Sequence, residues 1–202
     1  MITNCRVIVF AKAPVAGFAK TRLIPALGAR GAAALALRLL EHAMHQARLA
    51  GPAALELCCA PEAGHAAFST WAGDAGVTLT GQGDGDLGQR MARALERGLQ
   101  QQPRVILIGT DAPGLDAAVL HSAAAALASH DAVFVPALDG GYVLVGLRKL
   151  LPTLFEGMTW SVPTVMQETR ERLRRAGALS LELPALADID VPADLVHLPQ
   201  GW

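Results

Sequence analysis

The sequence predicts a single α/β domain in which a mostly parallel sheet lies between two layers of helices. Short apolar runs rich in β-branched residues alternate with longer segments of helical periodicity, and glycine and proline cluster in the connections. No internal repeat, low-complexity tract or linker divides residues 1–202. Strands that alternate with helices form βαβ units, whose parallel strands are covered on both faces. We therefore expect one three-layer αβα domain that spans the whole chain.

The expected strands are short and apolar, as strands buried on both faces are. Residues 105–109 carry the strongest signal, because they begin with an uninterrupted apolar run from Val105 to Ile108. The first strand is expected at residues 6–11, immediately before a polar loop. The remaining strands are expected at residues 54–60, 77–79, 131–137, 142–147 and 179–183.

The expected helices show apolar residues at helical spacing and recognisable ends. Asp86 has the character of an N-cap, and Gln89 three residues later completes the pattern of a capping box. Ser161 is expected to cap a later helix that Gly177 stops. The other helices are expected at residues 29–50, 68–75 and 116–129, with a short helical turn near the C-terminus.

The composition favours a cytoplasmic protein that acts on small molecules. Hydrophobic residues make up 52% of the chain and charged residues 17%, so disorder is not expected. The longest apolar runs are too short to span a bilayer, and the N-terminal residues lack a signal peptide's basic lead and cleavage site. A formal net charge of −1 argues against nucleic-acid binding. Three cysteines without a CxxC pair predict reduced, buried thiols.

A cationic loop at residues 12–22 follows the first strand. Lys12, Lys20 and Arg22 lie in it, with Gly17 between them. Lysine supplies a point charge and arginine a bidentate fork, and both suit phosphate oxygens. The loop is not a Walker P-loop, because Ala19 rather than a glycine directly precedes Lys20. Ligands of open α/β sheets bind at the carboxyl ends of strands, so we interpret the loop as a phosphate site. The alternative is a solvated loop with ordinary surface charges.

Two further polar groups are expected at the same edge of the sheet. Asp111 follows the strongest strand and is well placed to hold Mg²⁺ or Mn²⁺ that substrate phosphates carry. Its alternative role is to cap a turn. Asp139, Gly140 and Gly141 precede another strand, and paired glycines let a backbone approach a ligand closely. They also favour a hairpin turn, so a substrate contact by Asp139 remains an open question.

Arg90 and a pair of C-terminal carboxylates complete the candidate residues. Arg90 lies near the start of the helix that Asp86 opens, where an anion could bind. Asp188 and Asp190 alternate along the chain and point to opposite faces if the segment is extended. We therefore expect only one of these two carboxylates to face the ligand.

The candidate segments together resemble a bacterial glycosyltransferase-like family. The members of this family are described as nucleotide-diphospho-sugar transferases, and some as radical-SAM/selenodomain-associated transferases. The resemblance extends over about residues 6–198. It is carried by FAKAPVAGFAKTRL at residues 10–23, GDLGQRM at 85–91, GTDAP at 109–113, DGGY at 139–142 and DIDVPADL at 188–195, in this order.

The resemblance implies the nucleotide-diphospho-sugar transferase fold, which is GT-A-like and shared with sugar-nucleotide cytidylyltransferases and molybdenum-cofactor guanylyltransferases. In those relatives the loop after the first strand holds the nucleotide. By position, Lys12, Gly17, Lys20 and Arg22 become contacts of the nucleotide phosphates, with Arg90 as a further candidate. The loop lacks the Ala-Gly-Gly run of the nucleotidyltransferases, so no base preference is implied.

The resemblance also implies a Mg²⁺ or Mn²⁺ site. Asp111 becomes the principal metal ligand, Asp190 aligns best with a second carboxylate, and Asp188 is the reserve. The candidate catalytic residues are then Asp111, Asp139 and Lys20. The segment from Asp139 through Gly140 and Gly141 becomes the candidate substrate contact.

Three functions remain open from the sequence. The first is a metal-dependent transferase that moves a sugar from a nucleotide-sugar donor to an acceptor hydroxyl. The second is a nucleotidyltransferase, in which a phosphorylated small molecule attacks the α-phosphate of a nucleoside triphosphate and releases pyrophosphate. The third is a non-catalytic nucleotide-binding partner of another enzyme. All three imply a small nucleotide or nucleotide-sugar ligand, and none implies nucleic acid or a membrane span.

Overall fold

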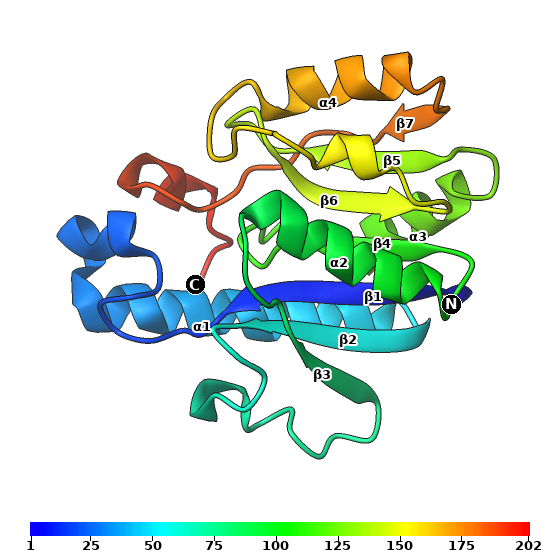
Figure 1. The fold of residues 1–202 in the computed structure, drawn as a ribbon. Coiled ribbons are helices and arrows are strands. Elements are labelled where there is room, and N and C mark those ends of the chain that lie inside the picture. Colours follow the sequence, from blue (N-terminus) through cyan, green and yellow to red (C-terminus); the bar gives the residue numbers. More distant parts are fainter.

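The computed structural model describes residues 1–202 as one seven-stranded sheet flanked by helices (Figure 1). The strand order is β3-β2-β1-β4-β6-β5-β7. Strand β6 is antiparallel to its neighbours β4 and β5, and every other pair is parallel. The strands are β1 (Ile2–Lys12), β2 (Pro52–Ala60), β3 (Val77–Gly81), β4 (Val105–Ile108), β5 (Ala132–Pro136), β6 (Tyr142–Leu147) and β7 (Ser180–Glu182). The mostly parallel sheet expected from the sequence is confirmed.

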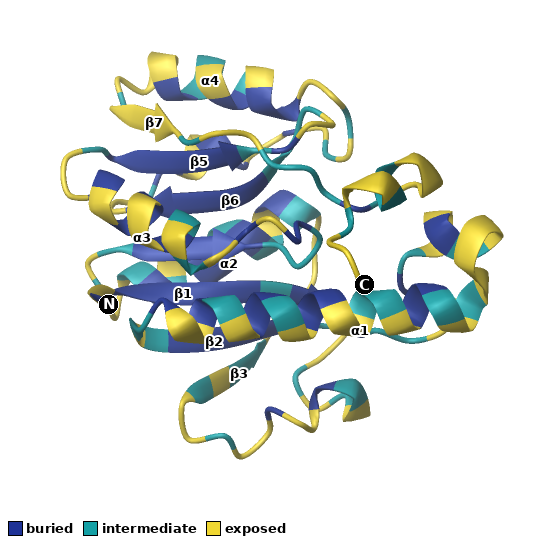
Figure 2. Cartoon of the chain, turned by 180° about the vertical axis from the view of Figure 1, so that it is seen from behind, coloured by how far each residue is buried: buried dark blue, intermediate teal, exposed yellow.

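The two faces of the sheet pack against different helices. Val7 and Val9 of β1 belong to a large apolar cluster shared with α1 (Ile24–Leu49) and α3 (Ala117–Ala126). Ile8 between them belongs to a second cluster shared with α2 (Leu87–Leu99) and α4 (Val165–Arg175). This alternation is the two-residue period of a strand that is buried on both faces. Figure 2 shows the buried strands between helices whose outer faces are exposed.

The helix ends confirm one prediction and modify another. Asp86 and Gln89 form the expected capping box, in which each side chain accepts a hydrogen bond from the other residue's backbone N–H. Helix α1 begins at Ile24, before the expected start at residue 29. Gly28 has φ 69° and ψ 164° and produces a kink there, so the uninterrupted part of the helix does begin at residue 29.

Two helix predictions are wrong. Residues 68–75 form turns after a short 3₁₀ helix at Ala66–Phe68, because Gly73 adopts φ 90° and interrupts the helical backbone. Ser161 does not cap α4, which begins four residues later. Its φ is 62°, and Pro163 disfavours a helical conformation at the residue before it. The short helical turn expected near the C-terminus is confirmed as a 3₁₀ helix at Pro192–His197.

The segment Thr21–Leu49 is long and apolar enough, by length and composition alone, to cross a membrane. In the structure this segment packs on the sheet through Leu40, Ala43, Met44 and Ala47. A helix that covers the core of a domain satisfies the same criterion, so the segment is weak evidence for a membrane span.

Candidate functional site

A cleft of about 570 Å³ opens where the parallel strands end. Lys12 ends β1 and Ala60 ends β2, and the loop that follows β4 brings Asp111 to the same edge. Tyr142, the first residue of the antiparallel strand β6, also lines the cleft at this edge. The cleft therefore lies at the edge of the sheet where ligands of α/β proteins bind.

Lys20 and Asp111 meet at this cleft. The Lys20 backbone is left-handed, with φ 49° and ψ 44°, and its Nζ lies 2.6 Å from Asp111 Oδ1. The same ammonium group donates a hydrogen bond of 2.5 Å to the carbonyl oxygen of Ile189. The Lys20 side chain is only 6% exposed, whereas that of Asp111 is 48% exposed. The structure thus brings together a cation and a carboxylate that the sequence assigned to phosphate and metal.

The two C-terminal carboxylates have different surroundings. Asp190 pairs with Arg22 at 2.5 Å in an exposed ion pair. Burial raises the pKa of Asp188 to about 6, and the negative charges of Asp139 and Asp111 add to the shift. Asp188 therefore lies in the electrostatic field of Asp139 and Asp111, whereas Asp190 lines the cleft together with Asp111. The resemblance implied Asp190 as the second metal ligand with Asp188 in reserve, and metal ligation by either stays a prediction. We place Asp188 first in it because Asp190 is already paired with Arg22 and because these two carboxylates act on Asp188.

The oxygen atoms that Lys20 contacts, a carboxylate and a carbonyl, are of the kinds that a divalent cation prefers. No group of three or more His, Cys, Asp or Glu side chains is arranged to hold a metal by itself. Mg²⁺ is commonly held by one or two carboxylates together with substrate phosphates, so Asp111 with one of the C-terminal carboxylates would be a sufficient protein contribution. Lys20 already places a positive charge between the Asp111 carboxylate and a carbonyl oxygen. This donor set is the chemistry that a hard cation requires.

Arg90 lines the cleft, as the sequence predicted, and Gln82 fixes its position. Gln82 is buried, and its Nε2 donates to the carbonyl oxygens of Ala11 and Cys58 at 3.0 and 3.2 Å. These two bonds leave its Oε1 to accept from Arg90 at 3.3 Å. Sequence analysis missed Gln82, although a buried polar residue directly after the strand β3 was a usable signal.

The loop after β1 also contributes as predicted to the wall of the cleft. Lys12, Lys20 and Arg22 all line it. Gly17 adopts φ 85°, which other residues rarely do, and no atom lies within 4 Å of the position that a Cβ would take. Phe18 lines the cleft while 68% exposed, and sequence analysis missed it. Contact of these side chains with phosphate stays a prediction.

Asp139, Gly140 and Gly141 form the tight turn between β5 and β6, at the cleft edge of the sheet. Asp139 Oδ1 accepts a hydrogen bond of 2.8 Å from the Gly141 N–H. Gly140 has φ 94°, and a Cβ there would lie 2.0 Å from the carbonyl oxygen of Pro163. The turn prediction is confirmed. A substrate contact by Asp139 stays a prediction, although its charge already affects Asp188.

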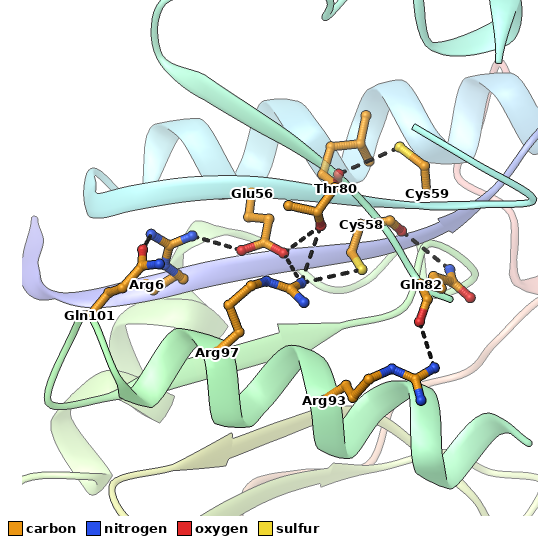
Figure 3. A network of polar contacts seen from close by, with 10 residues as sticks. Arg6, Glu56, Cys58, Cys59, Thr80, Gln82, Arg93, Arg97 and Gln101 are labelled. Carbon is orange, nitrogen blue, oxygen red and sulfur yellow. Dashed lines mark hydrogen bonds and ion pairs between the residues drawn. The ribbon is translucent and has the colours of Figure 1, made fainter. Parts of the chain in front are cut away.

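A buried ionic network lies on the same face of the sheet as α2 (Figure 3). Glu56 of β2 is fully buried and pairs with Arg6 of β1 at 2.7 Å and with Arg97 of α2. Thr80 Oγ1 donates a hydrogen bond of 2.7 Å to Glu56. The desolvation cost of burying a carboxylate is large, and the two arginines and Thr80 offset part of it. None of these four side chains lines the cleft. We therefore assign the network a role in the stability of the fold.

Comparison with solved structures identifies the fold. The chain is 32% identical to a candidate nucleotide-diphospho-sugar transferase from Desulfovibrio desulfuricans G20, with a TM-score of 0.87 over 96% of this chain and 85% of that chain. A CMP:2-keto-3-deoxy-manno-octonic acid synthetase complexed with CTP is 11% identical, with a TM-score of 0.60 over 96% of both chains. The Rv0371c protein of Mycobacterium tuberculosis H37Rv, in complex with manganese, is 16% identical, with a TM-score of 0.59 over 99% and 100% of the chains. The expected nucleotide-diphospho-sugar transferase fold is confirmed.

Comparison with curated proteins gives no significant match. The sequence does match a protein family over residues 43–162, a stretch that includes β2, the helix α2, Asp111 and the turn before β6. This match, together with the 32% identity over nearly the whole chain, shows that the protein belongs to the family DUF2064, described as "Uncharacterized protein conserved in bacteria".

Proposed function

We propose that this protein is a transferase that acts on a nucleotide donor and uses Mg²⁺ or Mn²⁺. The observation that carries the proposal is the contact between Lys20 and Asp111 at the carboxyl ends of β1 and β4. A cationic loop and a carboxylate that meet in one cleft provide what a phosphate-bound divalent cation needs. The cleft volume of about 570 Å³ lies within the range of small-molecule sites.

Each side of the cleft has its own task in this proposal. Lys12, Lys20 and Arg22 bind and orient the diphosphate of the donor, because the loop after β1 directs them to the same cleft. Asp111 and Asp188 hold the cation, which when bound would neutralise negative charge on the diphosphate as it leaves. Catalysis then rests on positioning and electrostatic stabilisation rather than on a covalent intermediate with the protein.

Two structures of similar fold support the proposed nucleotide donor and the proposed metal, respectively. The synthetase of similar fold is complexed with CTP, and the Rv0371c protein is in complex with manganese. They are 11% and 16% identical to this chain, so what they share with it is the fold, and they identify neither the base nor the acceptor.

Transfer of a sugar is the first candidate reaction, because the structure with 32% identity is described as a candidate nucleotide-diphospho-sugar transferase. The oxygen of an acceptor hydroxyl would bond to the anomeric carbon of the donor. The bond from that carbon to the diphosphate would break, and the nucleoside diphosphate would leave with the electron pair. In this proposal Asp139 lies on the acceptor side, and its carboxylate accepts the hydroxyl proton.

Transfer of a nucleotide is the second candidate, and the CTP-bound structure of similar fold favours it. An acceptor oxygen would bond to the α-phosphorus of a nucleoside triphosphate. The bond between the α-phosphorus and the bridging oxygen would break, and pyrophosphate would leave. The chain also forms a single sheet, and the cleft of about 570 Å³ at its edge suits a small acceptor better than a polymer.

A ligand screen followed by product analysis tests the proposal. Nucleoside triphosphates, nucleoside diphosphates and nucleotide sugars are added to the protein with and without Mn²⁺, and the unfolding midpoint is recorded, because tight binding raises it. We expect a nucleotide to raise the midpoint more with Mn²⁺ than without. Release of a nucleoside diphosphate then identifies sugar transfer, and release of pyrophosphate identifies nucleotidyl transfer. No stabilisation by any nucleotide would refute the proposed function.

A further inference from the structure

The C-terminal residues 188–202, which we call the strap, cross the molecule from the edge of β5 to α1 (Figure 1). Just before the strap, Leu186 runs alongside the end of β5. Its N–H donates to the carbonyl oxygen of Pro136 at 3.0 Å, and its carbonyl oxygen accepts from the N–H of Leu138 at 3.1 Å. One end of the crossing segment is therefore fixed to the sheet.

The first residues of the strap lie at the cleft. Ile189 is fully buried, and its N–H donates a hydrogen bond of 2.9 Å to the carbonyl oxygen of Asp111. Its own carbonyl oxygen accepts from Lys20 Nζ at 2.5 Å. The backbone of Ile189 thus joins the loop after β1 to the loop after β4, and it sets the position of Asp188 and Asp190 on either side.

A turn within the strap stiffens this region. The Asp194 carboxylate accepts hydrogen bonds from the N–H groups of Asp190 and Val191 at 2.8 and 2.7 Å. The same Asp194 donates its own N–H to the carbonyl oxygen of Val191 at 2.9 Å. The carboxylates at the cleft are therefore continuous with the 3₁₀ helix at Pro192–His197.

The far end of the strap is attached to α1 by an aromatic contact. Trp202 packs edge-on against His42, with ring centroids 5.2 Å apart, and the Arg38 guanidinium lies 5.0 Å from the centre of its ring. Arg38 also donates a hydrogen bond of 2.9 Å to the carbonyl oxygen of Gly201. Trp202 belongs to a small apolar cluster with Leu23, Ala32, Leu39, Ile189, Leu195 and Leu198.

We propose that Trp202 is a positioning residue for the candidate metal site, which it affects through the strap without touching the ligand. The proposal rests on the proposed function, because it concerns the same carboxylates. Trp202 and Ile189 share one apolar cluster, so loss of the indole loosens the segment that carries Asp188. A displaced supporting group weakens metal binding even when every ligand is retained.

The test compares Trp202→Ala with Trp202→Phe, which keeps an aromatic ring for Arg38 and His42. Val196→Ala is the matched control, because Val196 lies in the same strap and is 80% exposed. Mn²⁺ affinity is measured by electron paramagnetic resonance with pyrophosphate present. Amide hydrogen exchange at Ile189 is measured without metal, since it reports directly on the hydrogen bond to Asp111. Arg38→Met serves as a second variant if Trp202→Ala does not fold.

We expect Trp202→Ala to weaken Mn²⁺ binding by about 10- to 100-fold, the range for groups that support metal ligands. Exchange at the Ile189 amide should become faster, Trp202→Phe should restore both properties, and Val196→Ala should change neither. Unchanged exchange at Ile189, or faster exchange with unchanged Mn²⁺ affinity, would overturn the positioning role. Wild-type protein that binds no Mn²⁺ would overturn the proposed metal site itself, and the wild-type measurement alone reveals that result.

Discussion

Lys20 Nζ lies 2.6 Å from Asp111 Oδ1, so the residue expected to bind phosphate is paired with the residue expected to bind metal. The ammonium neutralises the carboxylate in the ligand-free protein. A metal ion at Asp111 and the ammonium would repel each other, whereas a donor diphosphate attracts both. We therefore expect Lys20 to move from Asp111 towards phosphate when metal and nucleotide bind together.

Lys20→Ala should change metal and phosphate binding in opposite directions. Without nucleotide, Mn²⁺ should bind at least as tightly as to the wild type, because a competing positive charge is gone. Binding of the pyrophosphate anion should weaken by about 1.5–3 kcal/mol, the range for hydrogen bonds to charged groups. Calorimetry measures both. Lys149→Ala is the control, because Lys149 pairs with Asp131 outside the cleft. Equal weakening of Mn²⁺ and pyrophosphate binding by Lys20→Ala would contradict the expected movement.

The two C-terminal carboxylates should differ in their effect on metal binding. Asp111→Asn and Asp188→Asn should each lower Mn²⁺ affinity by about tenfold or more, because each removes a charged oxygen ligand while keeping the shape of the side chain. Asp190→Asn breaks an exposed ion pair with Arg22. It should weaken Mn²⁺ binding by less than about 1 kcal/mol. The measurement is Mn²⁺ titration of all three variants. A large loss in Asp190→Asn with none in Asp188→Asn would restore the order that the alignment suggested.

Mn²⁺ affinity should fall as the pH drops through about 6. Burial and the charges of Asp139 and Asp111 raise the pKa of Asp188 to about 6, and a metal ligand must be deprotonated. The same shift predicts that the metal-free protein becomes more stable as the pH falls from about 7 towards 4, because the folded state then binds the proton more tightly than the unfolded state. Asp188→Asn should remove both effects. Mn²⁺ titration and chemical unfolding at several pH values test this, and an Asp188→Asn profile identical to that of the wild type would refute it.

Asp131 should contribute to resistance against acid. A hydrogen bond from Lys149, with others from the Leu179 N–H and Arg148, lowers the pKa of Asp131 to about 2. A lowered pKa stabilises the fold above the pKa of the unfolded state, and that contribution is lost as the pH falls from about 4 through 2. The unfolding free energies of the wild type and Asp131→Asn should therefore converge in acid. A constant difference from pH 7 to pH 2 would be inconsistent with this role.

Glu56→Ala should destabilise the protein without altering the cleft. It would leave Arg6 and Arg97 as uncompensated cations, and breaking such a buried pair costs about 3–5 kcal/mol. Glu182→Ala is the matched control, because its pair with Arg170 is exposed and should cost less than about 1 kcal/mol. Denaturant unfolding measures both variants. A similar loss in the two would show that burial of Glu56 does not matter.

Local sequence patterns predicted those elements whose cause lies within a few residues. The capping box of Asp86 and Gln89 is such a case, because its hydrogen bonds join residues three positions apart. The buried strand β4 is another, since a run of apolar side chains has to be covered on both faces. The turn at Gly140 also follows from its neighbours. The same reasoning failed at Ser161, where positive φ and Pro163 delay the helix.

Only the tertiary structure decided how the site residues combine. The sequence by itself placed Lys20, Asp111 and the two C-terminal carboxylates at strand ends, because parallel strands bring their carboxyl ends to one edge. It could not distinguish Asp188 from Asp190, because both have the same side chain and lie two residues apart. Their surroundings differ in the structure: Ile189 between them is bonded to Asp111 and Lys20, Asp190 pairs with Arg22, and burial together with the charges of Asp139 and Asp111 raises the pKa of Asp188. These contacts join positions up to 169 residues apart, and long-range packing of this kind has no signature in local sequence.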